Sequence, residues 1–161
     1  ARYTDQVLFT WMEDFESPGL SFEELPSSDT TLVKVYDNDK VFEGSASAGI
    51  FLDADHDLFQ GMTNEAFELP GGQQPTYLEM NFRCNTRFLV GLVANGIGNT
   101  SVLDILVLNP TGEWKKVYVN LGATVSRQTG VLDYNIYLRA GLDEGLSEGE
   151  VLIDNLKLLH Y

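Results

Sequence analysis

The stretch Gly149–Tyr161, GEVLIDNLKLLHY, is the clearest strand in the sequence, and one acidic residue, Asp154, is set in the middle of its apolar residues. Those apolar residues are Val151, Leu152, Ile153, Leu156, Leu158 and Leu159. A carboxylate in such a strand is costly to bury unless a partner compensates for its lost hydration. The sequence leaves two kinds of partner open: a cation, or protein groups such as backbone N–H donors or a Lys or Arg side chain.

The composition limits what the protein binds. The chain has 161 residues and a formal net charge of −14, and its apolar content is that of a globular domain with a core of its own. Such a charge argues against nucleic acid and anionic membrane surfaces, which require basic patches, and it is compatible with cation binding. Cys84 is the only cysteine, which excludes an internal disulfide and is typical of a small core residue.

Short apolar or alternating segments separated by Asn, Gly, Pro and Asp recur along the chain and predict strands. We expect strands at residues 7–12, 32–36, 41–43, 44–53, 66–69, 77–84, 87–94, 101–108, 114–121, 133–141 and 149–161. We expect loops at residues 20–31 and 54–64, with 56–64 the segment most open to a short helix, and a hairpin over 32–43. Without crossover helices the strands favour an all-β fold, an antiparallel jelly-roll sandwich, in one domain over residues 1–161.

Several segments occur in an order that is known from other proteins. They are EDFES at 13–17, FEGSASAGIFLD at 42–53, YLEMNFRC at 77–84, NPTGEWKKVYVNLG at 109–122, YNIYLRAG at 134–141 and GEVLIDNLKLL at 149–159. In these segments the chain resembles the calcium-containing, galactose-binding-like jelly-roll modules that bind carbohydrate in bacterial polysaccharide-degrading systems. The Phe-Glu and Ile-Asp-Asn-Leu segments at the two ends carry most of the specificity. The resemblance implies that the first and last strands lie together, with a structural calcium ion beside them.

The chain departs from the family pattern after its Phe-Glu segment. The family often has Gly followed by Trp there, whereas this chain has Pro18-Gly19-Leu20-Ser21-Phe22. We therefore expect no exposed aromatic residue for sugar stacking at this place.

The candidate calcium ligands are Glu16, Ser45 and Asp154. Calcium takes six to eight oxygen ligands from carboxylates, carbonyls and water. Glu16 and Asp154 supply carboxylates, and the small residues 44–47 would let a backbone carbonyl approach. A cation would explain an acid in an apolar strand, although backbone N–H donors or a basic side chain would explain it without a metal.

A second acidic motif, Asp53-x-Asp55-x-Asp57, has the spacing of a calcium loop. An EF-hand loop then requires Gly at its sixth position and Glu at its twelfth, where this chain has Leu58 and Asn64. The motif is therefore interpreted as a solvated acidic loop.

Alternation along three strands predicts a polar sheet face suited to sugar. Its candidate residues are Tyr77, Glu79, Arg83, Tyr118, Tyr137 and Arg139. Aromatic faces stack on the C–H side of a pyranose, and charged or amide groups bind its hydroxyls. The alternative is an ordinary solvated face with cross-strand Tyr, Glu and Arg pairs. Trp114 is expected to be a core residue.

These observations predict a non-catalytic module that binds a polysaccharide or oligosaccharide and holds a structural calcium ion. We expect it outside the cytoplasm, secreted, periplasmic or on the cell surface, with membrane contact only through a lipid anchor lost with a removed leader. The alternative is a structural or protein-interaction sandwich of a surface assembly without a sugar site. An enzyme is not expected, because His56 and His160 have no Ser or Cys partner in a recognisable motif.

Overall fold

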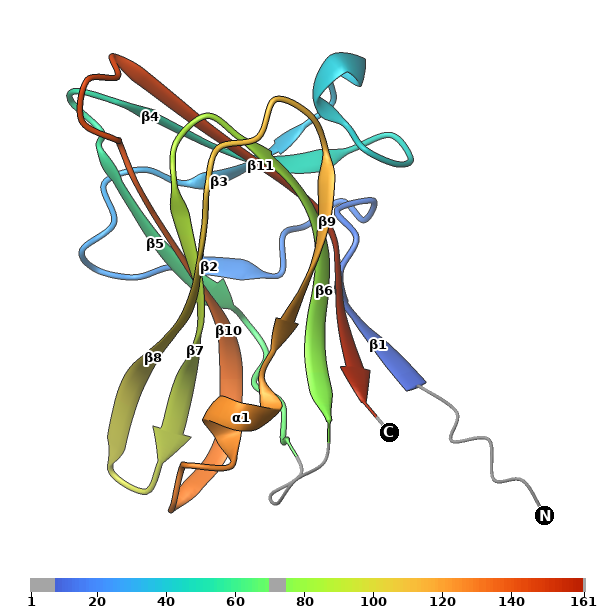
Figure 1. Ribbon diagram of the computed structural model, residues 1–161, viewed down its shortest axis with the longest axis vertical. Coiled ribbons are helices and arrows are strands. Elements are labelled where there is room, and N and C mark those ends of the chain that lie inside the picture. The colour runs from blue at the N-terminus through green and yellow to red at the C-terminus, as the bar shows by residue number, and fades with distance from the viewer. Residues whose placement is uncertain (1–7, 70–74, 161) are drawn as a thin grey trace.

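The computed structural model describes residues 8–69 and 75–160, with the side chains described from residue 13 onward. Two antiparallel sheets pack face to face, as the sequence predicts (Figure 1). One sheet has six strands: β1 (Leu8–Glu13), β3 (Leu32–Val35), β4 (Ser47–Asp53), β6 (Thr76–Cys84), β9 (Lys115–Asn120) and β11 (Glu148–His160). The other has five: β2 (Phe22–Glu24), β5 (Leu58–Thr63), β7 (Phe88–Gly96), β8 (Asn99–Leu108) and β10 (Val131–Gly141).

Strand β11 organises the six-stranded sheet, whose order is β3-β4-β11-β6-β9. On one side β11 pairs with β6, and on the other it pairs first with β4 and then with β1. The first strand therefore lies beside the last, which confirms what the resemblance implies (Figure 1). The partner on this side changes between Ile153, opposite Ala48, and Leu156, opposite Glu13.

The five-stranded sheet has the order β2-β5-β10-β7-β8. The core lies between the sheets, and alternate residues of each strand fill it. Its largest fully buried side chains include Ile50, Leu78, Met80 and Ile153 from one sheet and Phe59, Leu92, Ile136 and Leu138 from the other. The remaining residues of each strand form the two outer faces of the sandwich.

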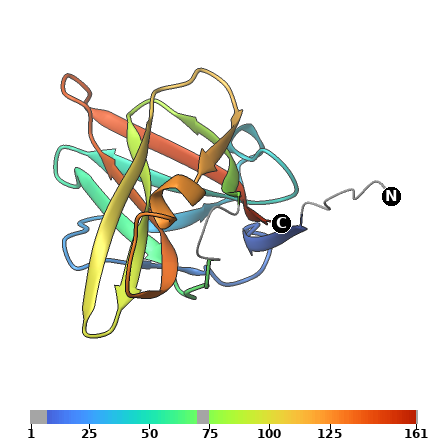
Figure 2. The same ribbon diagram turned by 60° about the horizontal axis from the view of Figure 1, so that its bottom comes forward.

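Four local predictions were wrong. Residues 66–69 are not a strand, because only Phe67 forms an isolated bridge, with Tyr134. Residues 58–63 of the expected acidic loop form β5, and residues 22–24 of the other expected loop form β2. Residues 32–43 do not form a hairpin, because a 3-10 turn, η1 (Asn38–Lys40), follows β3, which pairs with β4 instead. A single helical turn, α1 (Gly122–Val125), was not expected; it lies at the opposite end of the sandwich from η1, the end that faces the reader in Figure 2.

Candidate functional sites on the two faces of the sandwich

Asp154 is fully buried where β11 changes partner. Its Oδ1 accepts a hydrogen bond from the Asn155 N–H at 2.9 Å, and its Oδ2 accepts one from the Glu43 N–H at 3.2 Å. Burial raises the pKa of Asp154 to about 6, with smaller upward contributions from the negative charges of Glu16 and Glu43, and the two hydrogen bonds oppose this rise only in part. The carboxylate therefore has protein donors, but they do not offset its desolvation.

Glu16 and Ser45, the other predicted calcium ligands, lie together. The Glu16 carboxylate is exposed and accepts hydrogen bonds from the Ser45 hydroxyl at 2.7 Å and from the Ser45 and Ala46 N–H groups at 3.1 to 3.3 Å. The hydrogen bonds from Ser45 lower the pKa of Glu16. The loop can approach this closely because Gly44 has no side chain: a Cβ there would lie 2.1 Å from Glu16 Oε1.

Two residues that the sequence analysis did not select complete this region. Glu43 accepts a hydrogen bond from Asn155 Nδ2 at 2.9 Å. Asn81 is directly opposite Asp154 in the pairing of β6 with β11, so both side chains point to the same face. Asn81 is only 3% exposed, and its Oδ1 is the one buried side-chain polar atom of the described residues that has no hydrogen-bond partner.

The fit to a cation is therefore partial. In the described part of the chain, no group of three or more His, Cys, Asp or Glu side chains is arranged to hold a metal ion. An unpartnered buried amide oxygen beside a buried carboxylate is nevertheless the type of donor that calcium takes. Only the strand pairing brings these two residues together, so no local sequence signal could have selected Asn81.

Four of the six predicted sugar-binding residues share the outer face of the six-stranded sheet. Tyr77, Glu79 and Arg83 alternate with core residues of β6, and Tyr118 of β9 is opposite Glu79. Lys116 forms an ion pair with Glu79 at 3.2 Å, and Lys157 lies 4.0 Å from the same carboxylate. This face therefore combines aromatic and charged side chains, as the alternation predicted.

Trp114 belongs to this outer face and not to the core, so that prediction was wrong. The Arg83 guanidinium lies 5.8 Å from the centre of the Trp114 ring, and the Phe42 ring lies 5.6 Å from it. Trp114 stands just before β9 and alternates in step with Lys116 and Tyr118, because Val117 and Val119 are the residues that face the core.

Tyr137 and Arg139 lie on the opposite side of the sandwich, so the six predicted residues do not form one site. Both belong to β10 of the five-stranded sheet. Tyr137 is 2% exposed and packs with Leu89 and Val93 in a small cluster on the outer face, which leaves its ring unavailable for stacking. Arg139 is accessible, and its Nη2 lies 3.4 Å from Asp104 Oδ2.

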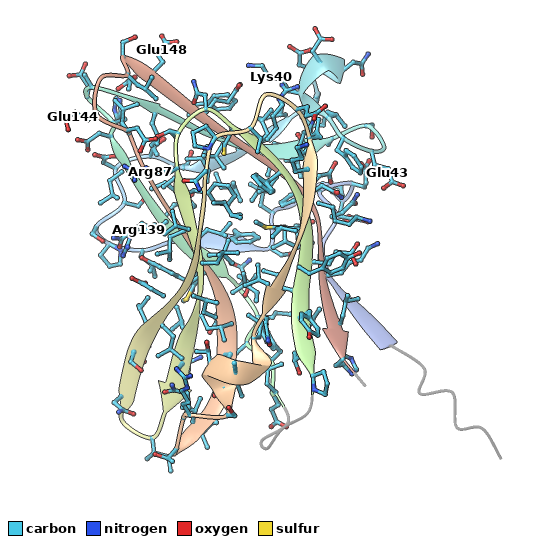
Figure 3. The ribbon with its side chains drawn as sticks, in the orientation of Figure 1. Lys40, Glu43, Arg87, Arg139, Glu144 and Glu148 are labelled. Carbon is cyan, nitrogen blue, oxygen red and sulfur yellow. The ribbon has the colours of Figure 1, made fainter. Side chains whose placement is uncertain are left out.

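Arg139 borders a depression of about 310 Å³ at the end of the five-stranded sheet's outer face. Leu89 and Val107 supply apolar surface, and Arg87 and Asp143 supply charge. Asp143 accepts hydrogen bonds from Arg87 N–H and Nε at 3.0 and 3.1 Å. Figure 3 shows Arg87 and Arg139 on the same side of the molecule, with Glu43 on the other.

A second depression, of about 410 Å³, lies on the six-stranded side near the start of β11 and includes Phe51 and Glu148. Lys40 occupies its border: the ammonium group pairs with Glu150 and lies 5.3 Å from the centre of the Phe51 ring.

The acidic motif Asp53-x-Asp55-x-Asp57 begins at this depression. Asp53 accepts hydrogen bonds from the N–H groups of Asp55 and His56, which lower its pKa, so its carboxylate closes a turn of the chain.

No protein-family model matches the chain, and no curated protein is similar to it in sequence. Solved structures do match over nearly the whole chain. The fold is that of carbohydrate-binding modules. A family 11 module of a cellulosomal cellulase of Clostridium thermocellum has a TM-score of 0.64 at 11% identity, covering 98% of this chain and 97% of that one. A mutant of a family 29 module complexed with mannohexaose has a TM-score of 0.57 at 12% identity, covering 96% and 92%.

A third similar structure is the family 11 module of the same organism in complex with a β-1,3-1,4-mixed-linked tetrasaccharide. Its TM-score is 0.62 at 10% identity, covering 93% of this chain and 94% of that one.

Within the described residues, none of the helices is long and apolar enough to cross a membrane.

Proposed function

We propose that the protein is a non-catalytic glycan-binding module whose ligand lies in the depression bordered by Arg87 and Arg139. The observation that carries this proposal is the combination of apolar floor and charged rim on the outer face of the five-stranded sheet. Sugar ligands need both kinds of surface, because a pyranose has apolar C–H faces and a rim of hydroxyl groups. The fold supports the proposal, since similar structures hold mannohexaose and a mixed-linked tetrasaccharide.

The rim is suited to hydroxyl groups, which both donate and accept hydrogen bonds. Each arginine is paired with a carboxylate, Arg87 with Asp143 and Arg139 with Asp104. Such a pair offers N–H donors and carboxylate acceptors side by side, and its charges offset each other. A neutral saccharide therefore fits this rim better than a charged one.

The proposal is one of binding without catalysis. Glycoside hydrolysis uses two carboxyl groups, one of which donates a proton to the leaving oxygen. The carboxyl groups of Asp104 and Asp143 both form ion pairs with the two arginines of this rim, an arrangement that suits ligand orientation. A module for polymeric glycans would act outside the cytoplasm, as a secreted, periplasmic or surface protein.

Affinity electrophoresis of the protein in native gels tests the proposal. We expect a gel containing mixed-linked glucan or mannan to retard the protein. Arg139→Gln should weaken binding about tenfold, because one hydrogen bond from a charged donor contributes roughly 1.5–3 kcal/mol. Arg127→Gln, a change at an exposed arginine after α1, serves as the control. Equal mobility in all neutral glycan gels would contradict the proposal.

One observation favours the alternative of a structural or protein-interaction module. The described aromatic residues with large exposed areas are Tyr36, Phe42, Phe51 and Tyr118, and all lie in or beside the six-stranded sheet. The depression on the five-stranded sheet therefore has no exposed ring for stacking among the described residues. A pull-down with a tight protein partner and no glycan retention would favour this alternative.

We further propose that a structural calcium ion binds beside Asp154. The residues that would hold it are Asp154, Asn81 and Glu43, with Glu16 and Ser45 close by. The unpartnered Asn81 oxygen and the unfavourable burial of Asp154 support this assignment. Chelation should lower the melting temperature by several degrees, because an ion that binds only the native state stabilises it. An identical melting curve in excess chelator and in calcium would contradict it.

A further inference from the structure

The outer face of the six-stranded sheet holds a group of basic residues that the proposed glycan site does not use. Arg83, Lys116 and Lys157, here called the basic strip, come from neighbouring strands or their ends: β6, β9 and β11. They are three of the ten Lys and Arg residues in a chain whose net charge is −14. Such a concentration of positive charge is unexpected in so acidic a protein.

Arg83 has no carboxylate within ion-pairing distance among the residues that the structure describes. Its guanidinium carbon lies over the Trp114 ring, 5.8 Å from the ring centre. Stacking of this kind orients the planar guanidinium and leaves its edge N–H groups available as donors. An arginine held in this way is prepared to bind a planar carboxylate or a sulfate with two parallel hydrogen bonds.

The two lysines share one carboxylate. Lys116 and Lys157 lie 3.2 and 4.0 Å from Glu79 Oε1, and Glu79 itself is buried at the base of the strip. The hydrogen bond that Lys116 donates to Glu79 and the negative charge of Glu79 raise the pKa of Lys116, with a smaller contribution from Glu43, so Lys116 stays cationic. Three positive groups thus share this face with the carboxylates of Glu79, Glu43 and Asp154. The charges nearly balance, so Arg83 is the cation of the strip that no carboxylate of the described residues pairs with.

Exposed aromatic rings border the basic strip. Tyr118 is 56% exposed and lies two residues from Lys116 on β9, and Phe42 is 46% exposed against Trp114. The register places Lys116 opposite Asn81, so Arg83 is its diagonal neighbour, about 7–8 Å away between backbones. Cationic and aromatic groups are therefore spaced within reach of one small ligand.

We propose that this face is a second binding site, for the anionic groups of an acidic saccharide. The carboxylate or sulfate would accept hydrogen bonds from Arg83 and Lys116, and the C–H face of the sugar ring would lie against Tyr118 or Phe42. This site is independent of the depression on the five-stranded sheet and takes a ligand of different charge. Both faces together would let one module bridge a neutral and an acidic glycan.

Native gels containing polygalacturonate, dextran sulfate or neutral dextran test this site. Acidic polymers repel a protein of charge −14, so retardation in an acidic gel reports a local site and not general attraction. We expect retardation by at least one acidic polymer, none by dextran, and weakening as sodium chloride is raised. Retention by polygalacturonate assigns a carboxylate ligand, and retention by dextran sulfate assigns a sulfate.

Matched arginine variants separate this site from the other. Arg83→Gln should weaken acidic retention about tenfold or more, whereas Arg127→Gln and Arg139→Gln should leave it unchanged. Thermal melting of Arg83→Gln checks that the variant folds, and Lys116→Gln provides a second test at the same strip. Absence of retention in both acidic gels, or equal loss in Arg127→Gln, would overturn this inference. Neither outcome would contradict the proposed binding of neutral glycans, which Arg139→Gln tests separately.

Discussion

Replacing Asp154 by Asn tests how the buried carboxylate is compensated. The variant keeps the size and one carbonyl oxygen of the side chain and removes the ionisable group. Burial raises the pKa of Asp154 from 3.8 to about 6, so at pH 7 ionised Asp154 destabilises the native state relative to the unfolded state when no metal is present. In chelator at pH 7 we therefore expect Asp154→Asn to be more stable than the wild type.

The expected size follows from the difference in pKa between the unfolded and native states. About two pKa units at 1.36 kcal/mol each correspond to a cost of about 3 kcal/mol for ionised Asp154. The Asn amide nitrogen cannot accept one of the two hydrogen bonds from Glu43 and Asn155, which removes roughly 1–1.5 kcal/mol. The net gain is about 1.5–2 kcal/mol, or a rise in melting temperature of roughly 3–8 °C for a domain of this size.

The dependence on pH has a definite sign. Between pH 3.8 and about 6, the native state binds the Asp154 proton more tightly than the unfolded state does, so this residue's contribution to stability falls as pH rises. Urea unfolding of both proteins in chelator from pH 4 to 7.5 should show the advantage of the variant growing across that window. The exposed residue Asp55 supplies the control, Asp55→Asn.

Calcium should reverse the order of stability, because the wild type gains the binding free energy and the variant loses a charged ligand. The reasoning would be refuted if Asp154→Asn were less stable than the wild type in chelator at pH 7. It would also be refuted if the difference between the two proteins were constant with pH.

Three further substitutions test local geometry. Gly91→Ala places a Cβ 2.2 Å from the Leu103 carbonyl oxygen. Because this oxygen belongs to the backbone, we expect a destabilisation of about 1–3 kcal/mol in urea unfolding. Gly112→Ala, where the space is open, should have a negligible effect. Glu16→Gln should lower the melting temperature near neutral pH but not at acidic pH. The native pKa of Glu16 is lowered, so its contribution to stability is present above pH 4.5 and is lost as the pH falls through the native pKa. A difference in melting temperature that persists in acid would contradict the role of the hydrogen bonds from Ser45. Asn155→Val should destabilise more than Asn155→Gly, since Asn155 has a φ of 55° that a β-branched residue adopts poorly, and equal melting temperatures would contradict this account.

Alternation and turn residues were sufficient to predict the sandwich and most of its long strands. The weakest predictions were those where core positions carry small or polar residues. In β5 the buried positions are Phe59, Gly61 and Thr63, which do not stand out as an apolar face. The 32–43 segment reads as a hairpin because both halves are apolar, but Asp37 caps η1 by accepting the Asp39 N–H, and the chain turns away.

Alternation tells which residues share one face of a strand, but not which sheet the strand joins. Tyr77 and Tyr137 have the same polar spacing around them, yet β6 and β10 belong to different sheets, so the predicted sugar site was divided. The partners of Asp154 were equally hidden: Asn81 and Glu43 lie 73 and 111 positions away along the chain. Only register across strands brings them to it.

The pair Asp154-Asn155 explains how β11 buries apolar residues both before and after an acidic residue in its sequence. Ile153 faces the core, and strict alternation would then turn Leu156 and Leu158 outward. The pairing of β11 with β6 shifts between Asp154 and Lys157, and Asn155 takes up the extra residue with its left-handed backbone. This bulge returns Leu156 and Leu158 to the core and leaves Asp154 on the outer side, at the junction of β4 and β1. The bulge at Asp154-Asn155 is therefore needed for the apolar residues on both sides of it to reach the core, whichever partner compensates the Asp154 carboxylate.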